Sequence, residues 1–147
     1  MSSLFWAPLE GDGPEPASDA RKLLIADDEP GIRRLVRMTL QSDDYEILEA
    51  ADGEEAVKLA REHKPELMLL DVMMPKRSGL EVCRVLKTDP ETAGITIFLL
   101  TARAQESDRR EGRAAGCDGY FMKPFSPISL MRKVEEIFID FKASSEL

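Results

Sequence analysis

Four short apolar runs along this chain are each followed directly by polar side chains whose types suggest phosphate chemistry. Each run is long enough for one buried strand, yet a strand needs no polar residue at its end. In an open parallel sheet, the carboxyl ends of the strands converge on the crevice where ligands bind. We therefore predict that these side chains share one site although they lie far apart in the sequence. They are Asp27 and Asp28 after Leu23–Ala26, Asp71 after Leu67–Leu70, Thr101 after Ile97–Leu100, and Lys123 after Tyr120–Met122.

The three carboxylates point to a hard divalent cation. Crowded ionised carboxylates repel one another, and a nearby cation makes their ionised forms tolerable. Oxygen ligands without His or thiolate select magnesium or calcium over zinc. Magnesium takes one or two carboxylates and a phosphate oxygen, which leaves one carboxylate free to attack phosphorus. We interpret Asp28 and Asp71 as metal ligands, and Thr101 and Lys123 as groups that stabilise a transferred phosphoryl group.

Each of these residues, taken alone, also has a purely structural interpretation. The pair Asp27-Asp28 precedes a helical pattern and could cap that helix. An Asp at a strand end is often a turn residue, and Thr101 is ordinary strand composition. The functional prediction therefore rests on all of them falling at one edge of one sheet.

Strand and helix patterns alternate from Lys22 onward. Pro30 suits the first turn of the first helix, and Asp52 with Glu55 resembles a capping box that begins the second. The fourth helix, roughly Glu106–Ala115, is rich in Arg. The last helix ends near Phe141 and carries one apolar stripe, made of Leu130, Met131, Val134, Ile137, Phe138 and Phe141. The expected strands are Lys22–Ala26, Tyr45–Ala50, Glu66–Leu70, Ile95–Leu100 and Gly119–Met122.

Five such repeats predict an α/β fold, a doubly wound five-stranded parallel sheet with helices on both faces. Right-handed crossovers limit the topologies, and the flavodoxin-like strand order 2-1-3-4-5 is favoured. We expect a flexible tail over residues 1–20, one folded domain over 21–142 and a C-terminal tail over 143–147. The cluster Leu4-Phe5-Trp6 in the first tail is either disordered, which we favour, or docks on the domain or a partner.

Composition narrows the function classes. A net charge of −8 disfavours direct nucleic-acid binding, which depends on Lys and Arg. No apolar run approaches the roughly 20 residues of a membrane span, and no secretory signal is recognisable. Cys83 and Cys117 lack a Cys-x-x-Cys spacing, so we interpret them as reduced packing residues and expect a cytoplasmic location.

Four motifs in this chain resemble those of response-regulator receiver domains, the CheY-like family. They stand in order, and the resemblance covers about Lys22 to Phe141. The intervals are 43 residues from Asp28 to Asp71, 30 more to Thr101 and 22 more to Lys123. The motifs are Leu23–Pro30 (LLIADDEP), Leu69–Pro75 (LLDVMMP) with Ser78-Gly79, Leu100–Ala102 (LTA) and Lys123–Phe125 (KPF).

The resemblance implies a magnesium site. Asp28 resembles a direct ligand, and Asp27 resembles the partner acid that acts more through water. Asp71 and the backbone carbonyl of Met73 resemble the remaining protein ligands.

The resemblance also implies a phosphorylation site and a switch. Asp71 resembles the phosphoacceptor, and Lys123 resembles the pocket ammonium, with Lys123-Pro124 a candidate cis peptide. Thr101 resembles the hydroxyl that moves toward the phosphoryl group, and Tyr120 the aromatic switch behind it.

By this resemblance, the chain is the phosphoacceptor of a two-component system or phosphorelay. A histidine kinase or histidine phosphotransfer protein would pass a phosphoryl group to Asp71. The modified state would present the fourth helix, fifth strand and fifth helix to an output partner or a second copy, because no output domain is expected in this chain. The single histidine, His63, lies at the end of the second helix and is no candidate phosphodonor.

Two other interpretations remain. A small aspartate-nucleophile phosphatase needs a second acid two residues after the nucleophile, where this chain has Met73, so we expect no enzyme. A receiver-like binding module that is never phosphorylated is the second, and the intact set of pocket residues disfavours it.

Overall fold

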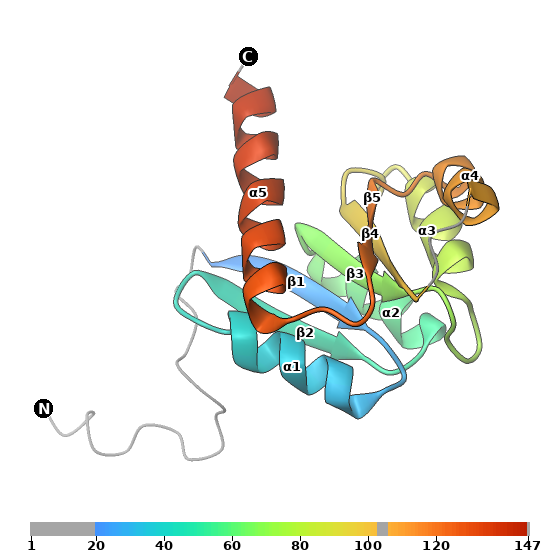
Figure 1. Cartoon of the computed structure of the whole chain (residues 1–147). Helices are drawn as coiled ribbons and strands as arrows, with labels where there is room; N and C mark the ends of the chain where they lie inside the picture. The colour runs from blue at the N-terminus through green and yellow to red at the C-terminus, as the bar shows by residue number, and fades with distance from the viewer. Residues whose placement is uncertain (1–19, 103–105, 147) are drawn as a thin grey trace, which may run out of the picture.

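The computed structural model describes residues 20–102 and 106–146 and shows a parallel sheet covered by helices on both faces (Figure 1). The predicted tail, with its Leu4-Phe5-Trp6 cluster, lies outside the described residues except for Ala20. The strands are β1 (Arg21–Ala26), β2 (Tyr45–Ala50), β3 (Leu67–Asp71), β4 (Thr96–Thr101) and β5 (Gly119–Met122). The helices are α1 (Pro30–Leu40), α2 (Gly53–His63), α3 (Gly79–Lys87), α4 (Glu106–Ala115) and α5 (Pro127–Glu146).

The strand order is β2-β1-β3-β4-β5, and every neighbouring pair is parallel. The predicted fold class and strand order are therefore confirmed. The order reverses between β1 and β3, and such a switch point opens a crevice at the carboxyl ends of the strands. In register, Ala26 lies opposite Leu70, and Asp71 lies opposite Leu100. The predicted site residues consequently meet at this edge.

Two apolar layers sandwich the sheet because alternate strand residues point to opposite faces. One layer joins Leu23, Ile25 and Leu69 to α1 and α5. The other layer joins Leu24 and Met68 to α2, α3 and the end of α4. Both faces of the central strands are buried, which explains why β3 reads as an unbroken apolar run.

Local sequence signals begin the helices as expected. Pro30 occupies the first turn of α1. The Asp52 side chain accepts a hydrogen bond from the Glu55 amide at 2.8 Å, and the Glu55 carboxylate accepts one from the Ala51 amide at 2.7 Å. Ser78 caps α3 through the Glu81 amide at 3.2 Å. The Asp52 and Ser78 contacts satisfy amides that the first helical turn leaves without partners, and Glu55 bonds the amide just before the cap.

The last helix differs from its prediction in two ways. It continues to Glu146 rather than ending near Phe141, because the last residues include no Pro or Gly to stop it. Met131 is 42% exposed, although it belongs to the predicted apolar stripe. Leu130 and Val134 of the same stripe are buried. The side chain of Phe141 lies outside the described part of the chain.

Two smaller sequence predictions concern the cysteines and the membrane. Cys83 and Cys117 are free thiols, and both pack in the layer beneath α2, α3 and α4. Burial raises the pKa of Cys83 to about 12, so this thiol stays protonated. Among the described helices, none combines the length and the apolar character that crossing a bilayer requires.

Candidate functional site

Three carboxylates meet at the carboxyl edge of the sheet. Asp27 and Asp28 follow β1, and Asp71 ends the neighbouring strand β3. One oxygen from each lies within 4.8 Å of the others. Asp27 is fully buried and Asp71 is 7% exposed, whereas Asp28 is open to solvent. The structure thus brings together the acids that the sequence predicted to share a site.

Lys123, just after β5, supplies the positive charge of this pocket. Its Nζ lies 2.8 Å from Oδ2 of Asp27 and 3.3 Å from Oδ2 of Asp71. Its backbone amide donates to the Thr101 carbonyl at 2.8 Å, which ties it to the end of β4. Burial by itself lowers the pKa of Lys123, but the two carboxylates overcome that effect and raise it, so the ammonium is retained. The Lys123-Pro124 peptide is cis, as the motif indicated.

The electrostatics of Asp71 show that one ammonium does not balance this pocket. Burial, followed by the negative charge of Asp27, raises the pKa of the Asp71 carboxyl to about 6. Lys123 and the amide of Met73 act in the opposite direction without cancelling the rise. A further cation near these carboxylates would therefore stabilise their ionised forms.

Short turns aim the carboxylate oxygens. Oδ1 of Asp27 accepts from the Glu29 amide at 3.0 Å, and Oδ1 of Asp71 accepts from the Met73 amide at 3.3 Å. Each is an Asp bonded to the amide two residues on, a common turn arrangement. Within the described residues, Oδ2 of Asp27 is buried without a hydrogen bond of good geometry, although Lys123 Nζ lies close. A donor set of oxygens alone, one of them incompletely bonded, fits magnesium.

Thr101, Met73 and Tyr120 surround the pocket in different ways. Thr101 ends β4 and is half-buried. The Met73 side chain is 77% exposed, so its amide and not its thioether faces Asp71. Tyr120 packs in the layer beneath α4, and a Cβ added at Gly112 would lie 1.9 Å from its hydroxyl oxygen. Burial foremost, and then the nearby Cys117, raise the pKa of Tyr120 to about 12.

Two contacts near the site were not foreseen from the sequence. Arg33 on α1 donates from Nη1 to the Asp27 carbonyl at 2.8 Å and from Nε to Glu49 at 3.2 Å. Lys76 has a φ of 69° and places its ammonium 3.5 Å from Asp52. In the sequence, Arg33 and Lys76 look like ordinary surface residues, because no local sequence pattern predicts a contact with another element.

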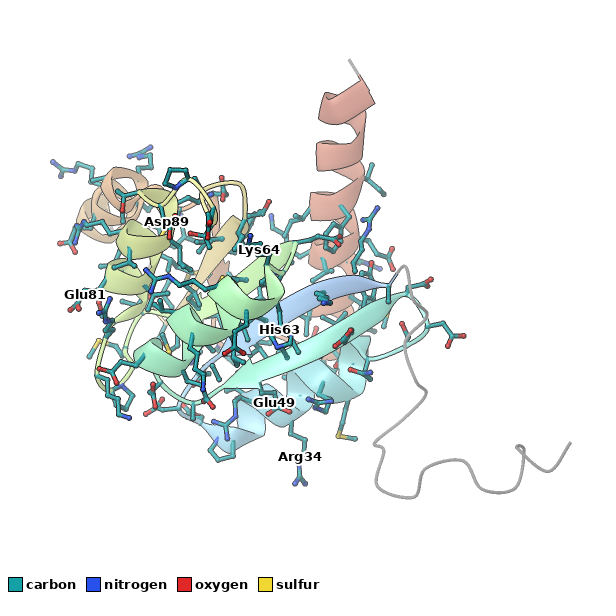
Figure 2. All side chains as sticks on the ribbon, turned by 180° about the vertical axis from the view of Figure 1, so that it is seen from behind. Arg34, Glu49, His63, Lys64, Glu81 and Asp89 are labelled. Atoms are coloured by element: carbon teal, nitrogen blue, oxygen red, sulfur yellow. The ribbon has the colours of Figure 1, made fainter. Side chains whose placement is uncertain are left out.

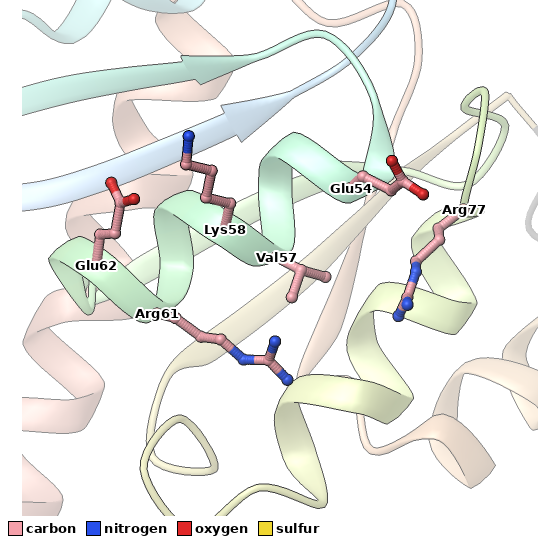
Figure 3. A pocket seen from close by; sticks show the side chains of 6 residues that line it. All are labelled: Glu54, Val57, Lys58, Arg61, Glu62 and Arg77. Atoms are coloured by element: carbon pink, nitrogen blue, oxygen red, sulfur yellow. The ribbon is translucent and has the colours of Figure 1, made fainter.

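Other candidate features lie away from these carboxylates. Figure 2 shows His63 with Lys64 at the far end of α2, and His63 lies 4.0 Å from Glu62. A groove of about 400 Å³ lies along α2 and contains none of the predicted site residues (Figure 3). Its lining residues are Glu54, Val57, Lys58, Arg61, Glu62 and Arg77.

Comparison with known proteins agrees with this geometry. The family model described as the response regulator receiver domain matches residues 23–135. The transcriptional regulatory protein ResD of Bacillus subtilis is 43% identical over 116 residues, which are 79% of this chain and 47% of ResD. The chain spans about half the length of the curated relatives it matches.

Solved structures of similar chains share the fold. Chemotaxis protein CheY4 of Vibrio cholerae has a TM-score of 0.75 and 32% identity, with 80% of this chain and 98% of CheY4 covered. The receiver domain of sensor histidine kinase PA1611 from Pseudomonas aeruginosa has a TM-score of 0.72 and 27% identity, with 80% and 96% covered. That structure is described as holding a magnesium ion coordinated in the active site cleft.

Proposed function

This chain belongs to the response regulator receiver domain family, and from that premise we propose that Asp71 accepts a phosphoryl group from a phosphohistidine. Receiver domains are signalling modules of two-component systems that partner with histidine kinases, and they are not catalytic enzymes. The donor here would be a histidine kinase or a histidine phosphotransfer protein. The observation that carries the proposal is a buried Asp71 that shares the Lys123 ammonium with a second buried acid, Asp27.

In the proposed transfer, an oxygen of Asp71 attacks the phosphorus of the donor. A phosphorus–oxygen bond forms while the bond from phosphorus to the donor imidazole nitrogen breaks, and that nitrogen keeps the electron pair. A pKa of about 6 leaves Asp71 largely ionised at neutral pH and hence nucleophilic. Lys123, 3.3 Å from Asp71, and the Thr101 hydroxyl would each stabilise an oxygen of the transferred group.

Magnesium would be held by Asp28, Asp71 and the Met73 carbonyl, with Asp27 acting mainly through water. The all-oxygen donor set and the incompletely bonded Oδ2 of Asp27 support this assignment. When bound, the ion would offset the negative charge that the carboxylates and the phosphoryl group bring together.

The output of the switch would run through Thr101 and Tyr120 to the face formed by α4, β5 and α5. Exposed Met122 and Ile128, at 48% and 64%, give this face an apolar component, and Arg113 on α4 adds positive charge. The occupant would be a partner protein or a second copy, without direct contact to nucleic acid or membrane. We further propose a cytoplasmic protein with the receiver domain over residues 21–142.

Intact mass after incubation with acetyl phosphate and magnesium tests the proposal. The wild type should gain one phosphate, and Asp71→Asn should gain none. Asp43→Asn, which changes an exposed turn acid in the same way, should be labelled like the wild type. A phosphate on Asp71→Asn would contradict the assignment. Failure of the wild type to label would favour an unphosphorylated binding module, and rapid turnover of the donor without retained phosphate would favour a phosphatase.

A further inference from the structure

The loop of residues 72–78, which joins β3 to α3, is held against the first turn of α2. The amide of Gly53 donates to the Pro75 carbonyl at 3.2 Å. The Lys76 ammonium lies 3.5 Å from Oδ2 of Asp52, the residue that caps α2. One backbone hydrogen bond and one ion pair therefore join two segments that are distant in sequence.

Gly53 lets the loop approach the helix more closely than any other residue would. A Cβ at this position would lie 2.2 Å from the carbonyl oxygen of Arg77 and 2.5 Å from its Cβ. A backbone oxygen cannot rotate away as the end of a side chain can, so a side chain here would have to displace the loop. Figure 3 shows Glu54 and Arg77 at the same end of α2, where helix and loop meet.

The loop adopts an unfavourable backbone conformation at Lys76. Lys76 has a φ of 69°, in the left-handed region that residues with a Cβ rarely occupy. The turn is tight, since the Arg77 amide donates back to the Pro75 carbonyl at 2.7 Å. Unfavourable backbone geometry of this kind persists where surrounding contacts determine it, and it concentrates at functional sites.

The same loop contains Met73, whose backbone carbonyl is the proposed magnesium ligand. Val72 is anchored to the sheet, because its amide donates to the Leu100 carbonyl of β4 at 3.1 Å, and its carbonyl accepts from the Gly79 amide at the start of α3 at 3.0 Å. Met73 follows directly and donates its amide to Asp71 at 3.3 Å. Met73 thus lies between an end fixed on the sheet and an end fixed on α2, so movement at Pro75 must be absorbed close to it.

We propose that Asp52, Gly53 and Lys76 form a latch, here the α2 latch, that positions the Met73 carbonyl and thereby sets the magnesium affinity of the pocket. They are positioning residues, because they act through the loop and not on the phosphoryl group. The inference rests on the proposed role of Met73 as a magnesium ligand. Residues that orient metal ligands from outside the coordination sphere commonly change metal affinity when they are substituted.

Gly53→Ala is the direct test, with Gly94→Ala as its matched control. Gly94 is exposed, and a Cβ there would have nothing within 4 Å. The measurement is the dependence of acetyl phosphate labelling on magnesium concentration. Gly53→Ala should raise the half-saturating concentration roughly tenfold. Its labelling rate at saturating magnesium should stay close to that of the wild type, and Gly94→Ala should match the wild type in both quantities.

A second variant keeps the test decisive if Gly53→Ala does not fold. Asp52→Asn retains a side chain able to cap α2 but removes the ion pair with Lys76. It should raise the half-saturating magnesium concentration by a smaller factor without changing the saturated rate. A purely structural role would instead lower the melting temperature and leave the magnesium dependence unchanged, and that result would overturn the latch.

Direct calorimetric titration with magnesium separates this inference from the proposed function. If the wild type binds magnesium and Gly53→Ala binds it equally well, the latch is wrong whether or not Asp71 can be labelled. If the wild type binds magnesium and Gly53→Ala binds it more weakly, the latch stands even where labelling fails. A wild type that does not bind magnesium would overturn both the metal site and the latch.

Discussion

Two small clusters of charged side chains lie at this sheet. One contains more positive than negative groups, and the other contains more negative than positive groups. The arginine cluster, between α1 and β2, sets two guanidinium groups around one carboxylate. The pocket cluster, at the carboxyl edge, sets two buried carboxylates around one ammonium, with Asp28 close by. The members are Arg33, Arg37 and Glu49 in the first, and Asp27, Asp71 and Lys123 in the second.

The arginine cluster satisfies its own charges. Oε1 and Oε2 of Glu49 each have a guanidinium partner, Arg33 Nε at 3.2 Å and Arg37 Nε at 2.6 Å. Further donors reach the carbonyls of Asp27 at 2.8 Å and Ile47 at 3.2 Å. The three side chains are 18–30% exposed, so water solvates the excess positive charge. Figure 2 shows Glu49 beside α1.

The pocket cluster does not satisfy its charges, and its burial makes this matter. Asp27 and Asp71 are nearly excluded from water, and the pKa of Asp71 rises to about 6. An excess of charge costs little at a solvated edge and much more in a buried one. The difference teaches that the first cluster is complete in itself and only joins α1 to β2, whereas the second is suited to receive a cation and a phosphoryl group.

The largest expected effect is the loss of labelling in Asp28→Ala. This variant keeps the nucleophile but removes the exposed carboxylate that completes the oxygen set. We expect acetyl phosphate labelling to slow by at least about 100-fold, which is the upper range even for substitutions outside a coordination sphere. Intact mass over time at fixed magnesium measures it. Labelling at the wild-type rate would show that the excess negative charge of the pocket does not serve a metal.

The stability of Lys123→Ala should depend on magnesium, which would distinguish the pocket cluster from the arginine cluster. Removing this ammonium leaves two buried carboxylates without their partner, so without magnesium the free energy of unfolding should fall by about 3 kcal/mol. Magnesium should restore part of this loss because it replaces the missing charge. Urea denaturation with and without magnesium gives both values.

Arg37→Ala is the control for that measurement. It removes one partner from a partly exposed pair and should cost about 1 kcal/mol. Its loss should be the same with and without magnesium. If the stability loss of Lys123→Ala were also the same with and without magnesium, the ammonium would be a structural group and not part of a cation-binding pocket.

The pH dependence of Asp71 should follow from its raised pKa. In the native state this pKa is about 6, whereas in the unfolded chain it is near its ordinary value of about 4. Between these values the native state holds a proton that the unfolded state has released. The wild type should therefore lose stability relative to Asp71→Asn as pH rises from about 4 to 6, and the difference should be flat on either side.

Urea denaturation of both proteins in metal-free buffer at several pH values measures this difference. Lys123, whose raised pKa affects stability only at alkaline pH, stays charged throughout the window. A difference that grew in favour of the wild type between pH 4 and 6 would mean that Asp71 is better stabilised as an anion than its burial suggests.

The smallest expected effect is that of Glu49→Gln. The arginine cluster is partly exposed, so losing its one carboxylate should cost at most about 1 kcal/mol, and less at high salt. Acetyl phosphate labelling should stay within about twofold of the wild type, since the bond from Arg33 to the Asp27 carbonyl survives. A strong loss of labelling would show that the two clusters act as one unit.

The sequence by itself determined the fold class, the strand order and the membership of the pocket. Apolar runs of strand length, separated by helical periodicity, leave few topologies once crossovers are right-handed. A parallel sheet then places the ends of β1, β3, β4 and β5 together, so Asp28, Asp71, Thr101 and Lys123 share an edge. The Asp52 cap was equally readable, because a helix start is a local pattern of a few residues.

Only the tertiary structure decided how the charges are shared and how the loop is held. Lys123 lies nearer to Asp27 than to Asp71, and the pKa of Asp71 follows from burial that no local pattern reports. The contact of Gly53 with the loop, and that of Arg33 with the Asp27 carbonyl, join segments distant in sequence. Such contacts depend on the paths of loops and on side-chain packing across elements. Periodicity and spacing specify neither, because they describe one element at a time.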